Sequence, residues 1–293
     1  MIIGKRDITA LVVLLLSAIV CVKYFYKDMN NARNMAKTNP YSLILPTAQA
    51  VFNVERPSVF KKMILPMKHI QATIEEHVPP VFLSIVNECV DLSSFMVAFY
   101  PEGCVLYASI DARIAQHIFK KLDESYTFPP LIQMEEDISV RYYPDINRRF
   151  LGCYYHNGIF VASFCKNLLT DTAEKQQSCP SHIIAGLKEL TSKKSKKEAI
   201  QLFMPGDSLN LYVQINDTLQ WRIQDQWLDM DLFYNDGSLF CFHEHPYRST
   251  LDSLYPSMRD TITTRLRQLL PAIETSTLVS HDETSAYFTI RWR

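Results

Sequence analysis

The sequence predicts an α+β domain whose antiparallel β-sheets are built from hairpin-plus-helix units with helices packed on one face, preceded by one N-terminal transmembrane helix. Three stretches of the chain repeat the order strand, tight turn, strand and helix, and this order is typical of antiparallel sheets covered by helices. Hydrophobic content of 47% and aromatic content of 12% indicate a packed core. The transmembrane helix is predicted by an apolar run close to the N-terminus.

That apolar run extends from Ile8 to Val22 and is preceded by two basic residues. Continuing the helix through Tyr26 gives a length of roughly 28 Å, close to the ~30 Å hydrocarbon core of a bilayer. We therefore expect residues 8–26 to contact lipid. A cleavable signal peptide is the alternative, but cleavage requires small residues after the apolar core, where this chain has branched ones. Lipid attachment at Cys21 is a further alternative, but Val20, which precedes the cysteine, is too bulky for the usual attachment site.

The chain is predicted to divide into a signal-anchor (residues 1–27), a polar tether (28–40) and an extracytoplasmic α+β domain (41–293). Two lobes split near residues 180–200 are the alternative to a single unit. Basic residues lie on both sides of the span, so the positive-inside rule does not decide its orientation. Because a short N-terminal anchor usually delivers the domain behind it across the membrane, we expect a periplasmic location.

The first hairpin-plus-helix unit has predicted strands at Phe95–Tyr100 and Cys104–Ser109, joined by a turn that contains Gly103. A helix over residues 112–123 follows, and Asp111 is placed to cap its first turn. Three residues at four-residue spacing form one apolar stripe on this helix: Ile114, Ile118 and Leu122.

The second unit has predicted strands near Ile138–Tyr143, Phe150–Tyr155 and Ile159–Cys165, followed by a helix through Ala173. Asn157-Gly158 separates the last two strands. This dipeptide adopts the positive φ that a tight hairpin demands, so it predicts a hairpin more firmly than any other turn in the chain.

The third unit has predicted strands at Leu209–Ile215, Trp227–Tyr234 and Leu239–His243, with an Asn-Asp-Gly turn before the last of them. A helix is predicted from Met258 to Leu270. The chain is predicted to end with strands at Thr277–Ser280 and Ala286–Trp292. The spacing between the units is irregular, so a true internal repeat is not required.

Composition excludes several classes of function. The chain has only 7 glycines, and no two are spaced to form a phosphate-binding loop or the dinucleotide fingerprint. The Gly-x-Ser-x-Gly element of many hydrolases is also absent. A formal net charge of −1 gives no electrostatic footprint for nucleic acid. No cofactor is therefore expected, and no nucleic-acid partner.

One group of residues suggests metal chemistry. If Cys241-Phe242-His243-Glu244-His245 is a strand, alternation places Cys241, His243 and His245 on one face. A thiolate and two imidazoles could hold zinc or copper. Known zinc signatures use wider spacing, however, and a strand end with polar tips explains the same residues. Asp229 and Asp231 share a face of the preceding strand, and paired carboxylates can serve acid–base chemistry or bind a cation. The same alternation of polar residues is typical of the solvent-facing side of an antiparallel strand.

Six cysteines lie outside the apolar run: Cys89, Cys104, Cys153, Cys165, Cys179 and Cys241. An exported domain with an even number of cysteines permits three disulfides in fifteen connectivities. Several of them sit within apolar strand patterns, however, where free buried thiols are the alternative.

Two phrases resemble a bacterial family of single-pass membrane-anchored proteins of unknown function (DUF3352-like). They are the run from Phe150 through Asn157-Gly158 to Cys165, which leads into a helix, and the run from Trp227 to Leu239. The resemblance covers residues 90 to 290. It implies a membrane-anchored location and this architecture, and it brings no catalytic residues.

These observations predict a membrane-anchored extracytoplasmic binding or scaffold protein of the cell envelope, which carries no catalytic signature and is expected to bind an envelope protein. The alternative is a metal-dependent hydrolase that uses the face formed by Cys241, His243 and His245.

Overall fold

The computed structural model describes residues 17, 23, 39–66, 68–88, 94–135, 137–145, 149–178, 183–192, 200–205, 212–214, 220–222, 227–235, 238–246, 275–281 and 285–292. Nearly all of the predicted anchor and tether therefore lies outside the described residues. Among the helices that are described, none has the length and apolar character needed to cross a bilayer.

The described helices, in chain order, are η1 (Pro40–Leu43), α2 (Pro57–Val59), η2 (Phe60–Ile64), α3 (Lys68–His77), α4 (Pro80–Glu88), α5 (Ala112–Ser125), α6 (Lys166–Ser178) and α7 (Ala185–Ser192). The first seven strands are β1 (Ala50–Val54), β2 (Ser94–Tyr100), β3 (Gly103–Ser109), β4 (Leu131–Glu135), β5 (Ile138–Pro144), β6 (Phe150–His156) and β7 (Ile159–Ser163). The remaining strands are β8 (Ile200–Pro205), β9 (Tyr212–Gln214), β10 (Gln220–Arg222), β11 (Trp227–Asn235), β12 (Ser238–Pro246), β13 (Thr275–His281) and β14 (Ser285–Trp292).

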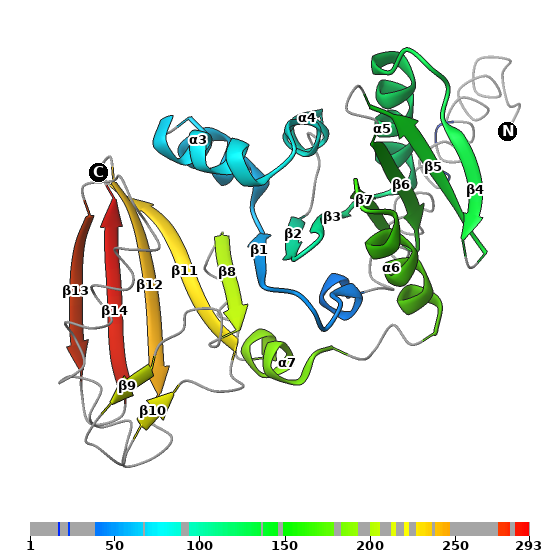
Figure 1. The fold of residues 1–293 in the computed structure, drawn as a ribbon. Coiled ribbons are helices and arrows are strands. Elements are labelled where there is room, and N and C mark those ends of the chain that lie inside the picture. Colours follow the sequence, from blue (N-terminus) through cyan, green and yellow to red (C-terminus); the bar gives the residue numbers. More distant parts are fainter. Residues whose placement is uncertain are drawn as a thin grey trace, which may run out of the picture.

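A 12-stranded sheet organises these elements, in the order β13-β14-β12-β11-β8-β1-β2-β3-β7-β6-β5-β4 (Figure 1). Every pairing in it is antiparallel, and β9 and β10 form a separate small antiparallel sheet. This confirms the predicted α+β class. Strands from before and after residues 180–200 belong to the same sheet, since β8 pairs with β1 on one side and with β11 on the other.

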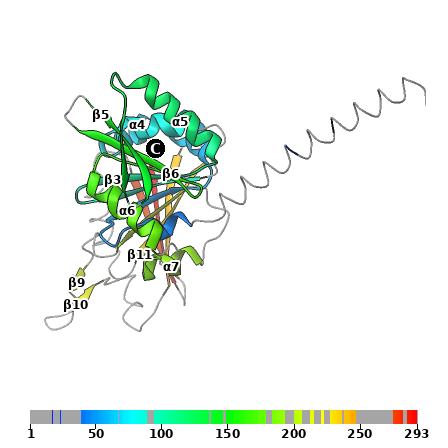
Figure 2. The ribbon, with the colours of Figure 1, turned by 90° about the vertical axis from the view of Figure 1, so that its right-hand side faces the viewer.

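Helices cover both faces of this sheet, so the prediction that they pack on one face is wrong. On one face, α4 and α5 bury Phe82, Ile118 and other residues against the strands. On the other face, η1, α6 and α7 contribute Leu43, Leu169 and Leu187 to a second core. Figure 2 shows α5 and α6 on opposite sides of the strands that they cover.

The two-sided cover explains why the central strands are apolar at successive positions. In β3, Val105 and Tyr107 belong to the core beneath η1 and α6, whereas Leu106 and Ala108 belong to the core beneath α5. All residues of β7 are buried. A strand covered on one face only would have shown alternating polar positions instead.

Both predicted hairpins in the first half of the chain are confirmed. Strand β2 pairs with β3, and β6 pairs with β7 through a turn in which Asn157 has φ 47° and Gly158 has φ 86°. The predicted cap is also confirmed, because the Asp111 carboxylate accepts a hydrogen bond of 2.8 Å from the Ile114 amide at the start of α5.

The third unit is confirmed only in its strands. The β11–β12 hairpin pairs Asn235 with Ser238, and β13 and β14 form the predicted terminal strands. Only residues 212–214 of the predicted strand at 209–215 are described, and they belong to the small separate sheet as β9. The predicted helix over 258–270 lies outside the described residues.

Buried tyrosines hold the segment around η1 against the sheet. The Tyr100 hydroxyl accepts a hydrogen bond of 3.1 Å from the Leu45 amide and lies 3.3 Å from the Tyr107 hydroxyl. Tyr107 also approaches the Leu43 carbonyl at 3.5 Å and the Thr172 hydroxyl of α6 at 3.4 Å. Burial raises the pKa of both tyrosines, so they remain protonated donors.

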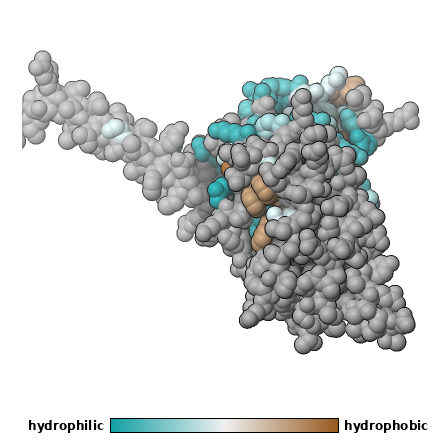
Figure 3. All heavy atoms as spheres, turned by 90° about the vertical axis from the view of Figure 1, so that its left-hand side faces the viewer, coloured by the Kyte–Doolittle hydropathy of each residue, from teal (hydrophilic) through white to brown (hydrophobic). Residues whose placement is uncertain are grey.

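Strands β13 and β4 form the two edges of the described sheet and lie at opposite ends of it in Figure 1. Figure 3 looks at the molecule from the side of β13 and α3. The described surface on that side is mostly hydrophilic, with small hydrophobic areas. Among the side chains that the structure describes, five of the six exposed large apolar ones lie in or near the β4 end: Phe128, Leu131, Ile132, Met134 and Phe150.

Candidate functional site: a groove between two helices

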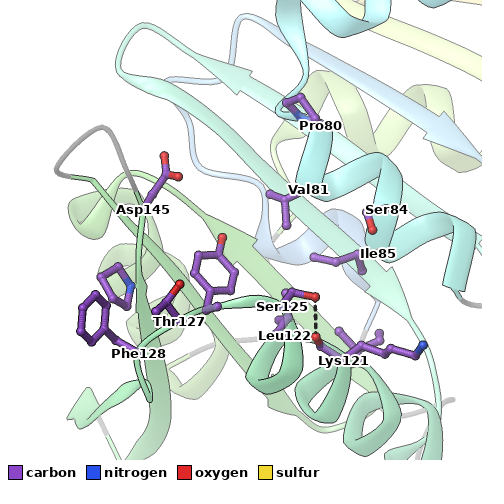
Figure 4. Close-up of a pocket in the computed structure, with 13 residues that line it drawn as sticks. Pro80, Val81, Ser84, Ile85, Lys121, Leu122, Ser125, Thr127, Phe128 and Asp145 are labelled. Atoms are coloured by element: carbon purple, nitrogen blue, oxygen red, sulfur yellow. Dashed lines mark hydrogen bonds between the residues drawn. The ribbon is translucent and has the colours of Figure 1, made fainter.

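A groove of about 660 Å³ separates α4 from the end of α5 (Figure 4). Pro80, Val81, Ser84 and Ile85 line it from α4. The opposite wall comes from α5 and the loop after it: Ile118, Lys121, Leu122, Ser125, Tyr126, Thr127 and Phe128. Pro144 and Asp145, at the end of β5, complete the lining.

The amphipathic pattern of the two helices creates the groove. In α4, Phe82, Ile85 and Val86 are buried against the sheet, and in α5 Ile118 and Leu122 are buried there as well. The sheet therefore holds both helices side by side, with the shoulders of their apolar stripes facing each other. Val81 and Ser84 of α4 lie on the shoulder opposite Leu122 and Ser125.

The chain after α5 forms the rim. The Tyr126 amide donates a hydrogen bond of 3.0 Å to the Leu122 carbonyl, which closes the last turn of the helix. Phe128 then projects into solvent with 66% of its surface exposed. This ring adds exposed apolar surface to the rim of the groove.

A second cavity of about 760 Å³ continues the groove toward the β2–β3 turn, since Pro80, Val81, Tyr126 and Asp145 line both. Its outer wall is polar. Arg149 lies 3.7 Å from the Asp145 carboxylate and 4.9 Å from the centre of the Phe164 ring. Together the two cavities form one elongated groove with an apolar floor and a charged end.

Tyr126 is the titratable group at the junction of the two cavities. Burial, and secondarily the charge of Asp145, raises its pKa to about 12. The phenol therefore stays protonated at neutral pH and offers a hydrogen-bond donor to an oxygen atom of a ligand.

The predicted metal site is only partly described. Strand β12 forms as predicted, and its register places Cys241 opposite Ile290, His243 opposite Phe288 and His245 opposite Ala286. Cys241 is 5% exposed and belongs to the core beneath α4 and α5. The side chains of His243 and His245 lie outside the described residues.

Asp229 and Asp231 occupy β11 as predicted, and both are partly buried. Asp231 accepts a hydrogen bond of 2.9 Å from the Gln201 side-chain amide of the neighbouring strand. That contact gives Asp231 a structural partner within the sheet. In the part of the chain with described side chains, no three potential metal ligands gather.

The four described cysteines of the domain, Cys104, Cys153, Cys165 and Cys241, are free thiols. The three-disulfide alternative is therefore wrong, whereas Cys89 and Cys179 lie outside the described residues. Cys104 packs against one core and Cys165 against the other, and both residues line the second cavity.

The groove was not predicted from the sequence. Periodicity identified α5 and its buried stripe, and Ile118 and Leu122 of that stripe line the groove, but the opposite wall from α4 and the rim after α5 were not predicted. One sequence signal could have pointed to it: the run Tyr126-Thr127-Phe128-Pro129-Pro130 places an apolar ring just after a helix, where prolines prevent it from folding back.

We predict that Cys153 and Cys241 resist alkylation at neutral pH. Burial raises the pKa of both thiols, to about 12 for Cys241, and thiolates are the reactive form. Mass-spectrometric mapping after a brief maleimide pulse should find both unmodified in the folded chain and modified in guanidinium chloride. Cys165, which is partly exposed, is the internal control. Labelling of Cys241 as fast as that of Cys165 in the folded chain would contradict the placement of β12.

No protein-family model and no curated protein matches the chain. Two solved structures align with much of it. Crystal form III of TP0453 has 11% sequence identity and a TM-score of 0.42, covering 87% of this chain and 93% of that chain. Crystal form IV of TP0453 has 13% identity and the same TM-score of 0.42, covering 87% of this chain and 94% of that chain. Likeness at this level says nothing about function, and the resemblance to the anchored bacterial family stays a prediction.

Proposed function

We propose that this protein is a membrane-anchored binding module of the cell envelope, and that its ligand site is the groove between α4 and α5. The observation that carries the proposal is the combination of an apolar groove of about 660 Å³ with an exposed aromatic ring, Phe128, on its rim. Ligand sites in proteins are typically concave, mostly apolar and of this size.

The lining supports recognition of a ligand that has an apolar part and a polar end. Val81, Ile85 and Leu122 provide the apolar floor. Polar groups are few and are placed at the margins, where Lys121 and Asp145 could fix the orientation of the ligand. Covering the exposed ring of Phe128 would also contribute to affinity, at about 25 cal/mol for each Å² of apolar surface removed from water.

The predicted anchor supports the membrane-anchored location in this proposal. The apolar run Ile8–Val22 would hold the chain at a membrane, with residues 28–40 as the tether. Thirteen residues reach at most about 45 Å when extended. Since the domain is pinned to the chain at η1 by buried tyrosines, the groove would stay within a short distance of the bilayer surface.

The metal-dependent hydrolase remains the second prediction. For Cys241 to bind zinc with His243 and His245, the metal would have to lie against the core in which Cys241 is buried. Coordination there would exclude the open water position that a catalytic zinc requires. Stoichiometric zinc that is lost in His243→Ala would favour this alternative over a pure binding module.

We predict that Ser125→Trp blocks the groove. Ser125 is exposed and lines the groove from α5, so an indole at this position would occupy the space between the helices. Using the apolar dye ANS as the probe, fluorescence titration of the full chain in a non-interfering detergent should show affinity reduced by at least about tenfold, about 1.4 kcal/mol.

The matched control is Lys120→Trp, which adds the same indole to α5 at an exposed position outside the groove lining. Both variants should melt at the temperature of the wild-type chain. Equal ANS affinity for the wild type, Ser125→Trp and Lys120→Trp would contradict the assignment of the groove.

We predict that deletion of residues 1–27 moves the chain from the membrane fraction to the soluble fraction, because the apolar run supplies its attachment. Protease added to intact spheroplasts should digest the domain of the full chain. Digestion only after lysis would place the domain in the cytoplasm and overturn the envelope location. Membrane retention of the deletion variant would overturn the anchor.

A further inference from the structure

The outer edge of β4 is a second candidate surface for binding a partner. β4 is the last strand of the described sheet, and it pairs with β5 along only one of its sides. We propose that a second copy of this chain pairs with it, β4 against β4 and antiparallel, so that two 12-stranded sheets join across a two-fold axis.

Among the strands whose side chains the structure describes, β4 has the most exposed large apolar residues. Leu131 is 55% exposed, Ile132 is 58% exposed and Met134 is 64% exposed. An apolar edge strand with open backbone groups is a template for another strand, and soluble proteins usually protect such an edge with charged residues, proline or a bulge. Within β4, Glu135 at the end is the single charged residue, and no proline interrupts the strand.

The sequence of β4 is self-complementary in the antiparallel register centred on Gln133. In this register Ile132 of one copy lies opposite Met134 of the other, and Met134 lies opposite Ile132. Both pairs share the face of the sheet that Arg141 and Ser139 occupy in β5. Two exposed apolar side chains in each copy would therefore be covered by the same two from the second copy.

The backbone is compatible with this register. Alternate residues of β4 direct their amide and carbonyl groups toward β5, and the others direct them outward. In this register, even-numbered residues of one copy lie opposite even-numbered residues of the other, and odd-numbered residues lie opposite odd-numbered ones. The residues whose backbone groups point outward in one copy therefore meet the residues whose backbone groups point outward in the other. A shift by one residue would place outward groups opposite inward ones and would leave them without partners.

The charge in β4 does not oppose the pairing. The Glu135 carboxylate is 3.3 Å from the Lys166 ammonium group and accepts a hydrogen bond of 3.2 Å from the Tyr142 hydroxyl. Lys166 also donates to the Gln133 side chain at 3.1 Å. These contacts place the carboxylate on the α6 face, away from the Ile132 and Met134 pairs.

Symmetry favours β4 of a second copy over its β13. Pairing β4 with β4 uses the same surface twice and closes with one contact. Pairing β4 with β13 would leave a free β4 at one end and a free β13 at the other, so further copies could add to both ends and build open fibres. Attachment to a membrane would further favour the closed pair, since it raises the effective concentration of the two copies.

The test uses the full chain in detergent, with its mass measured by light scattering after subtraction of the detergent. The wild type should have twice the mass of the I132K/M134K variant, in which lysines would face lysines across the axis. I132E/M134E should also be monomeric. An equimolar mixture of the two charge variants should recover the dimer mass, because opposite charges would then face each other.

Phe128→Ser is the matched control, since it removes an exposed apolar ring outside the proposed overlap and should leave the chain dimeric. Conversely, I132K/M134K should bind ANS in the groove as the wild type does, so this proposal and the groove assignment fail separately. A monomeric wild type at every concentration would overturn the interface, as would a charge variant that stays dimeric. Monomers persisting in the mixture would overturn the register.

Discussion

Burial of the central strands on both faces is the constraint on which the rest of the structure depends. β2, β3 and β7 carry large apolar side chains in both directions, so neither face can be left in water. One cover comes from α4 and α5. The other comes from α6 together with the chain around η1, whose Leu43 and Ile44 are fully buried. Hydroxyl groups of Tyr100 and Tyr107 satisfy backbone groups of that segment within the core, where an unpaired group would cost about 1–3 kcal/mol.

This arrangement also explains where the groove and the exposed apolar side chains lie. Two helices held on one face by buried stripes leave a groove between their shoulders, and that groove ends at Phe128 because the chain must leave α5 to begin β4. On the face that α5 covers, the helices do not extend to β4, so Ile132 and Met134 remain in solvent. The groove and the exposed edge thus both result from the way the helices cover this face of the sheet.

Much of the local structure could be predicted from the sequence, because it depends on neighbouring residues. Asn157-Gly158 required a hairpin, and Asp111 with the stripe from Ile114 to Leu122 required a capped helix; both are present. β4 was missed, since an edge strand of five residues with exposed apolar side chains shows no alternation. The helical cover on the second face was also missed. It depends on which strands become central, and that is settled by pairings as distant as Asn53 with Gln201.

Hydrogen exchange of the Leu45 amide tests the central claim most directly. This amide lies in an irregular segment near the start of the described domain, and its acceptor is the hydroxyl of Tyr100, 55 residues away. If the segment is an integral cover of the sheet, the amide should exchange only through global unfolding, as slowly as the amides of β7. Exchange as fast as in the exposed turn at Pro101-Glu102 would show that the segment is not part of the core, and would contradict the account.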